Sequence, residues 1–358
     1  MGALSGDLSQ LVVPGYQAAE LAFELGNAGA FGILPVKLEL VPEDTAGLPG
    51  TAAAIAEQIA SDPEFVGVIG PAFSGESQAA GEALDEAAVP FMTPSATNPG
   101  LADNSWTHWF RAVANDDAQG AAAAQYIRTV LGPNCTFVLS DGSTYGDGLA
   151  AIVSQDLQKK GAAVRAGKVL TPGRNRYAKL AGSVGRSGCG VVFYGGYAPE
   201  AARIRKQLSV AGVRHVTLVG GDGIRDASFL AATRASGRGT VATCPCANVV
   251  ASAGASARAF IARYTERWGE PPGIYSAEAW DVAQMYLAAI KSAKVTRVAI
   301  TDFFRGLSGF RGLTKTYTFE ADGELADASG LVYIYRDEGE NWAYLGQTDQ
   351  VPSNQGTS

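Results

Sequence analysis

Long hydrophobic runs are absent from this chain of 358 residues, and histidine and cysteine are scarce. No uninterrupted apolar stretch approaches the roughly 18 residues that a membrane-spanning helix needs. Two histidines and four cysteines are too few to predict a zinc cluster. The cysteines are also too few for a disulfide scaffold, although an even number is compatible with bridges in an oxidising compartment. The spacing Cys244-Pro245-Cys246 lacks the two-residue spacer of redox and zinc motifs, which favours buried strand cysteines or one half of a disulfide.

The chain also has fewer basic residues than acidic ones. The chain has 28 Lys and Arg against 35 Asp and Glu, which gives a formal net charge of −7. This acidic balance argues against nucleic-acid and anionic-membrane partners.

Enzyme motifs are also absent from the sequence. It has no Gly-x-Ser-x-Gly elbow, no Walker loop and no His-Glu-x-x-His, and neither His108 nor His215 is placed for a nucleophile–histidine relay. Residues 146–151 resemble a relaxed dinucleotide fingerprint, but residues 143–145 separate them from the strand end. We therefore expect no cofactor, no metal and no catalysis, and an α/β enzyme is the least favoured hypothesis.

The sequence does contain an alternation of β-rich runs and amphipathic helical stretches, which predicts an α/β fold with doubly wound parallel sheets. The expected strands are 36–40, 65–69, 89–92, 136–140, 163–169, 190–194, 216–220, 239–243, 315–319, 331–336 and 342–345. The expected helices are 51–60, 76–87, 116–130, 146–159, 176–185, 198–211, 256–268, 274–293 and 300–307.

The length predicts two domains, at roughly 150 residues each. The helical stretches after residue 249 carry no strands of their own, so we expect them to return and cover the first sheet. The predicted lobes are 1–114 with 250–325, and 115–249 with 326–347, followed by a flexible tail over 348–358. A chain that crosses between lobes several times makes a multi-strand hinge.

Loops that follow the predicted strands carry the candidate binding groups, since ligands of open α/β sheets bind at the carboxyl ends of strands. In the first lobe these loops offer Ser74, Ser95 and Thr97 beside a helix start whose N–H groups suit a carboxylate. An ordinary helix cap is the competing interpretation of Ser74. In the second lobe the loops offer Tyr197 and Asp222. Hydroxyls on one side and a phenol with an acid on the other are complementary to a zwitterion, because buried charges need partners.

Motifs in these loops and elsewhere occur in a characteristic order along nearly the whole chain. They are Gly2-Ala3-Leu4-Ser5-Gly6, Ser95-Ala96-Thr97-Asn98-Pro99, Phe110-Arg111 with Asp116 and Gln119-Gly120, Tyr145-Gly146-Asp147-Gly148, Tyr194-Gly195-Gly196-Tyr197 and Gly221-Asp222-Gly223. In this order they resemble the leucine/isoleucine/valine-binding protein family of type I periplasmic binding proteins. The resemblance implies two Rossmann-like lobes joined by a three-strand hinge, with an amino acid held as the lobes close.

The resemblance also implies roles for individual residues. The ligand carboxylate is expected at Ser74 and Thr97, with the backbone around Ser95 and Ala96 also in contact. The ammonium group is expected at Tyr197 and Asp222. Tyr145 matches an aromatic residue that lines the cleft, and Tyr275 and Glu278 are further candidates at the start of a first-lobe helix. We also expect a disulfide between Cys135 and Cys189, which begin two strands that this fold places side by side.

Two departures from the family pattern bear on these expectations. The strand that normally precedes the Gly2–Gly6 motif is missing from the printed sequence, so either the first sheet lacks its first strand or the printed start is artificial. Leu11 stands near the position where the family often has an aromatic that covers the ligand side chain, so branched-chain ligands are a family default.

The expected function is therefore capture of an amino acid, branched-chain or related, and its delivery to the membrane permease of an ABC transporter. A ligand-sensing module of a receptor or receptor kinase, with the same pocket, is the alternative. We expect a monomeric, extracytoplasmic protein, in the periplasm or at the cell surface, whose leader or anchor is absent from the printed sequence.

Overall fold

The structure, a computed structural model, describes residues 1–168, 177–251, 254–292, 294–348 and 350–351. It is an α/β protein with parallel sheets, as predicted. The chain divides into two compact units, and we describe each by itself: unit 1 is Met1–Val113 with Cys246–Ala328, and unit 2 is Ala114–Pro245 with Ser329–Ser358. The chain therefore passes from one unit to the other three times.

These boundaries differ slightly from the predicted lobes. Residues 246–249 and 326–328 belong to unit 1 rather than to the second lobe, and Ala114 belongs to unit 2. The tail predicted over 348–358 lies mostly outside the described residues. No described helix is both long enough and apolar enough to cross a membrane.

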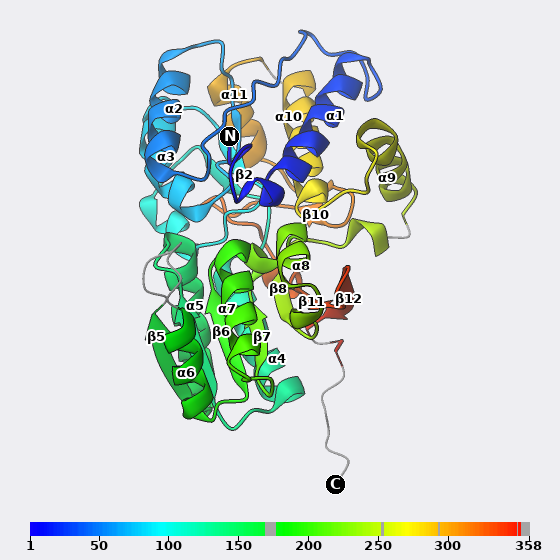
Figure 1. The fold of residues 1–358 in the computed structure, drawn as a ribbon. Coiled ribbons are helices and arrows are strands. Elements are labelled where there is room, and N and C mark those ends of the chain that lie inside the picture. The colour runs from blue at the N-terminus through cyan, green and yellow to red at the C-terminus, as the bar shows by residue number, and fades with distance from the viewer. Residues whose placement is uncertain (169–176, 252–253, 293, 349, 352–358) are drawn as a thin grey trace. The chain divides into compact units, whose positions relative to one another are not determined.

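Unit 1 is built on a three-stranded parallel sheet in the order β1-β2-β3, formed by Val68–Ile69, Phe91–Thr93 and Trp109–Arg111. Its helices are α1 (Val13–Asn27), α2 (Pro49–Ser61), α3 (Ser74–Glu86), α9 (Ala255–Trp268), α10 (Ser276–Ser292) and α11 (Arg297–Arg305). A short hairpin of β9 (Phe310–Arg311) and β10 (Thr316–Tyr317) follows. In Figure 1, α2 lies beside α3, and α1 beside α10.

Helices cover both faces of the unit 1 sheet. Phe91 and Trp109 pack in a core cluster with apolar residues of α2 and α3. Phe110, which points to the opposite face because side chains alternate along a strand, contacts Phe304 of α11 at a ring separation of 5.4 Å. The helices after residue 254 thus return to cover this sheet.

The strand predicted over 36–40 does not form, and that prediction is wrong. An open groove of about 500 Å³ separates residues 36–43 from β1, so the segment has no neighbouring strand to pair with. The chain start reaches between them: the Met1 amino group donates to Ile69 O at 2.9 Å, and Gly2 forms a parallel bridge with Asp44. Large hydrophobic side chains of the preceding turn and of this segment remain exposed, namely those of Phe31, Ile33, Val36 and Val41.

Unit 2 contains a seven-stranded sheet in the order β12-β11-β8-β7-β6-β4-β5. The strands are β4 (Thr136–Ser140), β5 (Val164–Lys168), β6 (Val191–Gly195), β7 (Thr217–Gly220), β8 (Val241–Cys244), β11 (Tyr333–Asp337) and β12 (Trp342–Gln347). Strands β4 to β8 are parallel, and β11 and β12 are added antiparallel at one edge.

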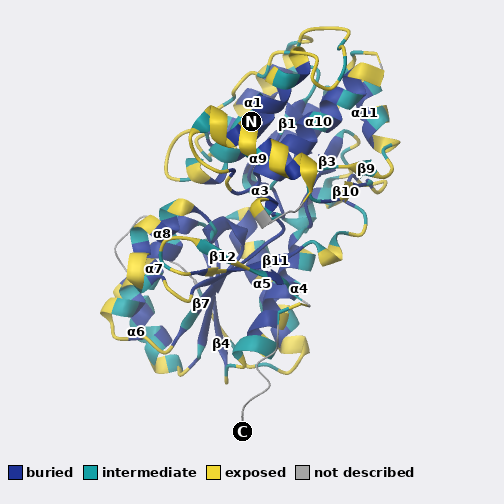
Figure 2. Ribbon diagram, turned by 90° about the vertical axis from the view of Figure 1, so that its right-hand side faces the viewer, coloured by how far each residue is buried: buried dark blue, intermediate teal, exposed yellow. Residues whose placement is uncertain are grey.

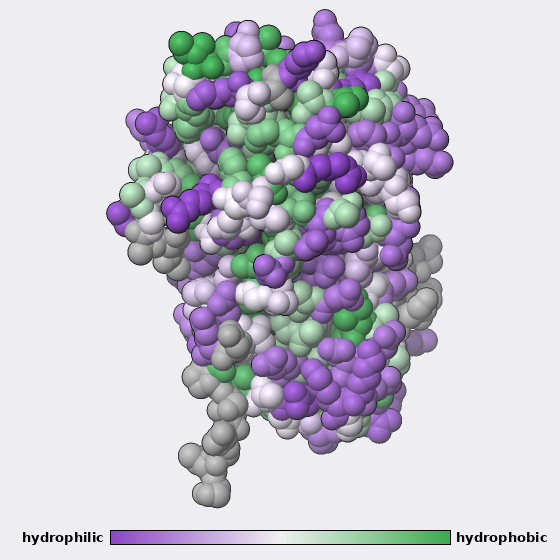
Figure 3. Space-filling model, turned by 180° about the vertical axis from the view of Figure 1, so that it is seen from behind, coloured by the Kyte–Doolittle hydropathy of each residue, from purple (hydrophilic) through white to green (hydrophobic). Residues whose placement is uncertain are grey.

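Two layers of helices bury this sheet, and Figure 2 shows its strands as a buried layer. The helices are α4 (Asp116–Tyr126), continued by a π-helical turn at Ile127–Leu131, α5 (Thr144–Lys159), α6 (Tyr177–Ser187), α7 (Ala198–Val210) and α8 (Ala227–Thr233). Val138 and Phe193 pack with residues of α4 and α5, whereas Leu139 and Val192 pack with α6 and α7. On the side seen in Figure 3, unit 2 is predominantly hydrophilic, whereas hydrophobic side chains gather over unit 1.

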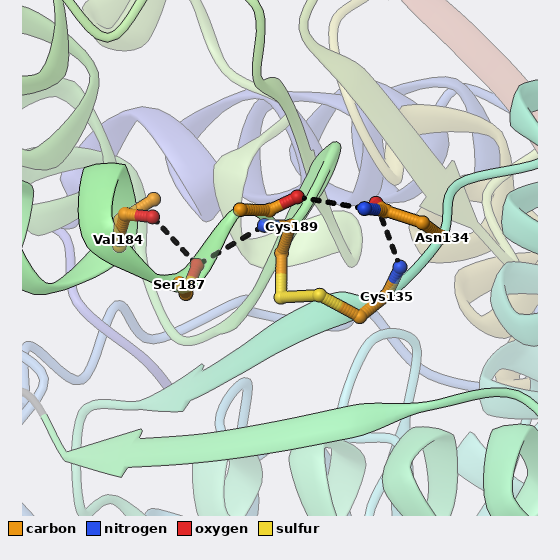
Figure 4. The surroundings of a disulfide bond; sticks show 6 residues. Asn134, Cys135, Val184, Ser187 and Cys189 are labelled. Carbon is orange, nitrogen blue, oxygen red and sulfur yellow. Dashed lines mark hydrogen bonds between the residues drawn. A yellow bond between two sulfur atoms is a disulfide. The ribbon is translucent and has the colours of Figure 1, made fainter.

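The predicted disulfide between Cys135 and Cys189 is confirmed, with Cα atoms 4.6 Å apart. Cys135 directly precedes β4 and Cys189 lies two residues before β6, and these strands are hydrogen-bonded neighbours. Around the bridge, Asn134 Nδ2 donates to Gly188 O at 3.0 Å and the Cys189 amide donates to Ser187 Oγ at 3.2 Å (Figure 4). All four cysteines are described and none is free.

Candidate ligand-binding site

Ser74 is the first residue of α3, not its cap, because the cap position is Phe73. The side chain is buried, and its hydroxyl oxygen accepts a hydrogen bond from the Asn98 amide at 3.2 Å. A hydroxyl that accepts in this way still has its own hydrogen to donate. This contact brings the start of α3 against the loop that follows β2.

The loop over residues 93–98 is held by hydrogen bonds within itself and to Ala72 and Arg111. Ser95 Oγ donates to Ala72 O at 2.8 Å, and the Ala96 amide donates to Thr93 Oγ1 at 2.9 Å. The Arg111 guanidinium donates to the carbonyls of Ala96 and Asn98, at 3.1 and 2.8 Å. The hydroxyl of Ser95 and the backbone of Ala96 are therefore used in fixing the loop itself.

Thr97 is different, because its buried hydroxyl has no hydrogen-bond partner within the described residues. An unsatisfied buried polar group costs about 1–3 kcal/mol. The Thr97 hydroxyl is therefore the polar group of this loop that is available to form a hydrogen bond with a ligand. The ligand contact predicted for Ser95 would be made by its backbone, and the Ser95 amide already donates to Thr93 Oγ1 at 3.3 Å.

The other two unit 1 candidates lie at the start of α10. Tyr275 is buried and has a left-handed backbone, with φ of 58°, which turns the chain into the helix. Glu278 is fully buried, and its Oε1 lies 3.0 Å from Lys315 Nζ and accepts from the Ala247 amide at 2.9 Å. Glu278 Oε1 thus has a cationic partner within unit 1, whereas the buried Oε2 has no hydrogen-bond partner within the described residues.

The unit 1 groove extends to these loops, since Leu11, Ser95 and Tyr275 line it together with residues 36–43 and 64–70. Leu11 is buried. An aliphatic residue at this position leaves more room than an aromatic one would.

In unit 2, Asp222 begins a short 3₁₀ helix directly after β7 and is nearly buried. Its Oδ1 accepts hydrogen bonds from Tyr145 OH at 2.7 Å and from Gln119 Nε2 at 2.8 Å. The Asp222 amide donates to Gln119 Oε1 at 3.2 Å, so one glutamine fixes both the backbone and the side chain. Neutral donors stabilise a carboxylate without cancelling its charge.

Tyr145 is a hydrogen-bond donor throughout the physiological range. Burial, followed by the nearby carboxylates of Asp222 and Asp116, holds the pKa of Tyr145 well above its usual range. The phenol hydroxyl also accepts from the Gly223 amide at 3.2 Å. Side chains on either side of Asp222 would not fit, because a Cβ on Gly221 would lie 2.3 Å from this hydroxyl and one on Gly223 would lie 2.7 Å from a backbone carbonyl.

Tyr197 caps α7 and is half-buried. Its ring lies against that of Tyr145, with centroids 5.3 Å apart and planes inclined by 34°. The structure therefore brings together the three candidates predicted in unit 2: Tyr145, Tyr197 and Asp222. It also brings the Ser74 and Thr97 loops together in unit 1. Three residues were given no such role from the sequence: Arg111, Gln119 and Lys315. For Gln119, the sequence offered only its capping-box spacing from Asp116 at the start of a predicted helix, which does not reveal its contact with Asp222.

Comparison with known proteins identifies the class of molecule. Residues 1–339 match the family model described as "Periplasmic binding protein". The chain belongs to this family. Because the family consists of solute-binding proteins, the chain is a binding protein and not an enzyme, and membership implies an extracytoplasmic location.

Several of the relatives that the chain resembles are named as amino acid binding proteins. The chain is 33% identical over 196 residues to an "Amino acid binding protein" of Pseudomonas aeruginosa, covering 55% of this chain and 52% of that one. It is 31% identical over 245 residues to the "Leu/Ile/Val-binding protein" of Escherichia coli K12, covering 68% and 66%. The matches thus span about half to two thirds of these relatives. A leucine-binding protein from Thermotoga maritima has the same fold, with a TM-score of 0.89 at 22% identity over 97% of this chain and 96% of that one.

Proposed function

We propose that this periplasmic binding protein captures a free amino acid, branched-chain or closely related, between its two units. The observation that carries the proposal is the Asp222 carboxylate, held near the end of β7 by Tyr145 and Gln119. A buried carboxylate suits an ammonium group, because the two groups carry opposite charges. The names of the relatives support an amino acid as the ligand class.

The unit 1 loops supply the complementary half of the proposal. Thr97 offers an unsatisfied hydroxyl, and Ser74 offers a hydroxyl beside the start of α3. Both groups can donate to a carboxylate, and the helix start adds its positive dipole end. In this proposal the ligand is bound fully only when both units engage it, so closure and binding are coupled.

Calorimetric titration with three ligands tests both halves at once. Leucine carries both charges, leucinamide lacks the carboxylate, and 4-methylpentanoate lacks the ammonium group. We expect Asp222→Asn to weaken leucine binding by at least about tenfold, since a hydrogen bond to a charge is worth roughly 1.5–3 kcal/mol. The same variant should bind 4-methylpentanoate as the parent protein does.

Thr97→Val provides the reciprocal arm. It should weaken leucine more than leucinamide, because valine has the shape of threonine without the hydroxyl and a neutral amide oxygen is a weaker acceptor than a carboxylate. Asp226→Asn is the matched control for Asp222: it is also a buried unit 2 acid, but it caps α8 through the Phe229 amide at 2.9 Å. Asparagine is an equally good cap. Unchanged leucine affinity in Asp222→Asn would exclude this site.

Delivery of the ligand to an ABC-transporter permease is the second part of the proposal. The same pocket would serve a receptor or receptor kinase, so ligand binding alone does not distinguish transport from sensing. Permease and ATPase genes beside this one would favour transport, and a signalling domain in the same reading frame would favour sensing. We also propose a monomer, which light scattering during size-exclusion chromatography tests.

A further inference from the structure

A buried ion pair occupies the core of unit 1. Lys315 Nζ lies 3.0 Å from Glu278 Oε1, and the side chains are 2% and 0% exposed. Removing two charges from water is costly, and a buried pair often stabilises a protein no more than apolar residues of the same size would. Its presence therefore calls for a role other than stability.

The partners of this pair point to that role. Glu278 Oε1 also accepts a hydrogen bond from the Ala247 amide at 2.9 Å. Lys315 Nζ also donates to the carbonyl of Ala112 at 3.3 Å. The first passage out of unit 1 follows Val113, and the chain returns at Cys246. The two backbone groups are thus next to the chain passages: Ala112 immediately precedes Val113, and Ala247 immediately follows Cys246.

A second acid on α10 fixes the turn that carries Lys315. Asp281, one helical turn after Glu278, accepts from the Leu313 amide at 2.9 and 3.0 Å and from Tyr317 OH at 2.9 Å. The turn is closed by the Gly312 amide, which donates to Lys315 O at 2.9 Å. The lysine is therefore held from the same rigid helix as its partner.

We infer that Glu278 and Lys315, here called the crossover pair, are positioning residues that fix the unit 1 ends of two of the three connections between the units. The inference rests on the proposed function, in which closure and binding are coupled. Because the pair holds Ala112 and Ala247 against α10, we expect these connections to bend only on the unit 2 side of these two residues. The pair thereby sets where the connections flex.

Hydrogen exchange of the ligand-free protein tests the attachment directly. In Lys315→Met we expect the Ala247 amide and residues 112–114 to exchange at least about tenfold faster than in the parent protein. Arg297→Met is the matched control, since Arg297 also holds unit 1 backbone carbonyls, those of Ile59, Ala60, Asp62, Phe65 and Ala87. It should lower the melting temperature without changing exchange at Ala247. Equal exchange at Ala247 in the two variants would overturn the inference.

Leucine binding tests whether the attachment matters for closure. We expect Lys315→Met to change the leucine dissociation rate by at least about fivefold and Lys315→Arg to restore it. The double variant Glu278→Gln/Lys315→Met removes the unpaired buried charge, so it should regain the melting temperature but keep the altered rate. If the double variant regained both the melting temperature and the leucine dissociation rate of the parent protein, the pair would have a structural role alone and the inference would be overturned. If the parent protein binds no amino acid, the proposed function fails, and the exchange experiment still decides whether the connections are attached.

Discussion

Burial changes the acidity of Asp281 more than its hydrogen bonds do. Burial raises the pKa of this carboxyl from 3.8 to about 7, against the lowering effects of the Leu313 amide and the Tyr317 hydroxyl. The charge of Glu278 raises it further and that of Lys315 lowers it. The folded protein therefore binds a proton at Asp281 that the unfolded chain releases at much lower pH.

The pH dependence of stability follows from this difference. Because the pKa of Asp281 is raised in the folded state, the folded protein carries more protons than the unfolded chain between about pH 4 and pH 7. The stabilisation that comes from protonated Asp281 is therefore complete below about pH 4 and is lost as the pH rises through about 7. We expect the free energy of unfolding to fall from pH 5 to pH 8 by on the order of 2 kcal/mol more in the parent protein than in Asp281→Asn. Urea unfolding of both proteins at pH 5 and pH 8 measures these free energies of unfolding.

A control is needed because other buried acids act in the same direction. Burial also raises the pKa of Glu76 and of Asp226. Only the difference between the parent protein and Asp281→Asn isolates Asp281, and Asp302→Asn, at an exposed position on the neighbouring helix α11, controls for the loss of one carboxylate. Parallel slopes for the parent and Asp281→Asn would contradict the prediction.

At the scale of elements, the Cys135–Cys189 disulfide joins neighbouring strands across a sequence separation of 54 residues. A bridge of this kind restricts the unfolded chain, which is typically worth about 2–4 kcal/mol. We expect Cys135→Ala/Cys189→Ala to lose that amount in urea unfolding. Unfolding with and without reductant gives the internal check: reduction should destabilise the parent protein by more than the double variant. Equal loss on reduction would argue against the bridge as a stabilising element.

The groove beside β1 leads to another element-scale prediction. In β1, Val68 is bonded toward β2 through Pro90 O, whereas Ile69 O points the other way and accepts from the Met1 amino group. A short extension of β-branched residues fused ahead of Met1 should therefore enter the groove parallel to β1. It would bury apolar surface and replace the buried amino group, whose pKa burial lowers, with an amide.

The extended protein should melt at a higher temperature than the parent and slow the exchange of residues 36–43. An extension of the same length with proline at alternate positions is the control, because proline cannot donate to a strand ladder. If both extensions melt at the same temperature, the groove does not accept a strand.

Which elements a sequence reveals depends on whether the signal is local. In unit 2, β4 was predicted with its observed limits and α7 to within one residue, since buried parallel strands are apolar runs and the helix start is marked by Pro199. Helix α1 was not predicted, although Pro14 stands at its start as Pro199 stands at the start of α7. The segment 36–40 has a strand-like composition, yet it forms no strand, because no strand of the described residues pairs with it.

The candidate site divides in the same way. The loops that hold Thr97 and Asp222 could be located because ligand sites in this architecture follow strand ends. Arg111, Gln119 and Lys315 could not be assigned, because their roles depend on partners far along the chain. Arg111 pairs with Glu324, 213 positions away, and Gln119 with Asp222, 103 positions away. Such pairings become visible only when the chain is folded.

At the scale of the whole molecule, two units with separate cores are joined by three chain passages. If one ligand engages Asp222 in one unit and Thr97 in the other, its binding free energy opposes their separation as well as their unfolding. A ligand at about one hundred times its dissociation constant stabilises the folded state by roughly 2.7 kcal/mol. Saturating leucine should therefore raise the melting temperature and also reduce the radius of gyration in small-angle X-ray scattering.

The two readouts together separate closure from simple binding. Asp222→Asn should show neither effect with leucine, while Asp226→Asn should show both, because Asp226 is engaged in capping α8. A ligand that stabilises the protein without reducing the radius of gyration would be held by one unit alone. In that case the groups of the other unit, Thr97 or Asp222, would not be ligand contacts, and coupling of binding to closure would have to be abandoned.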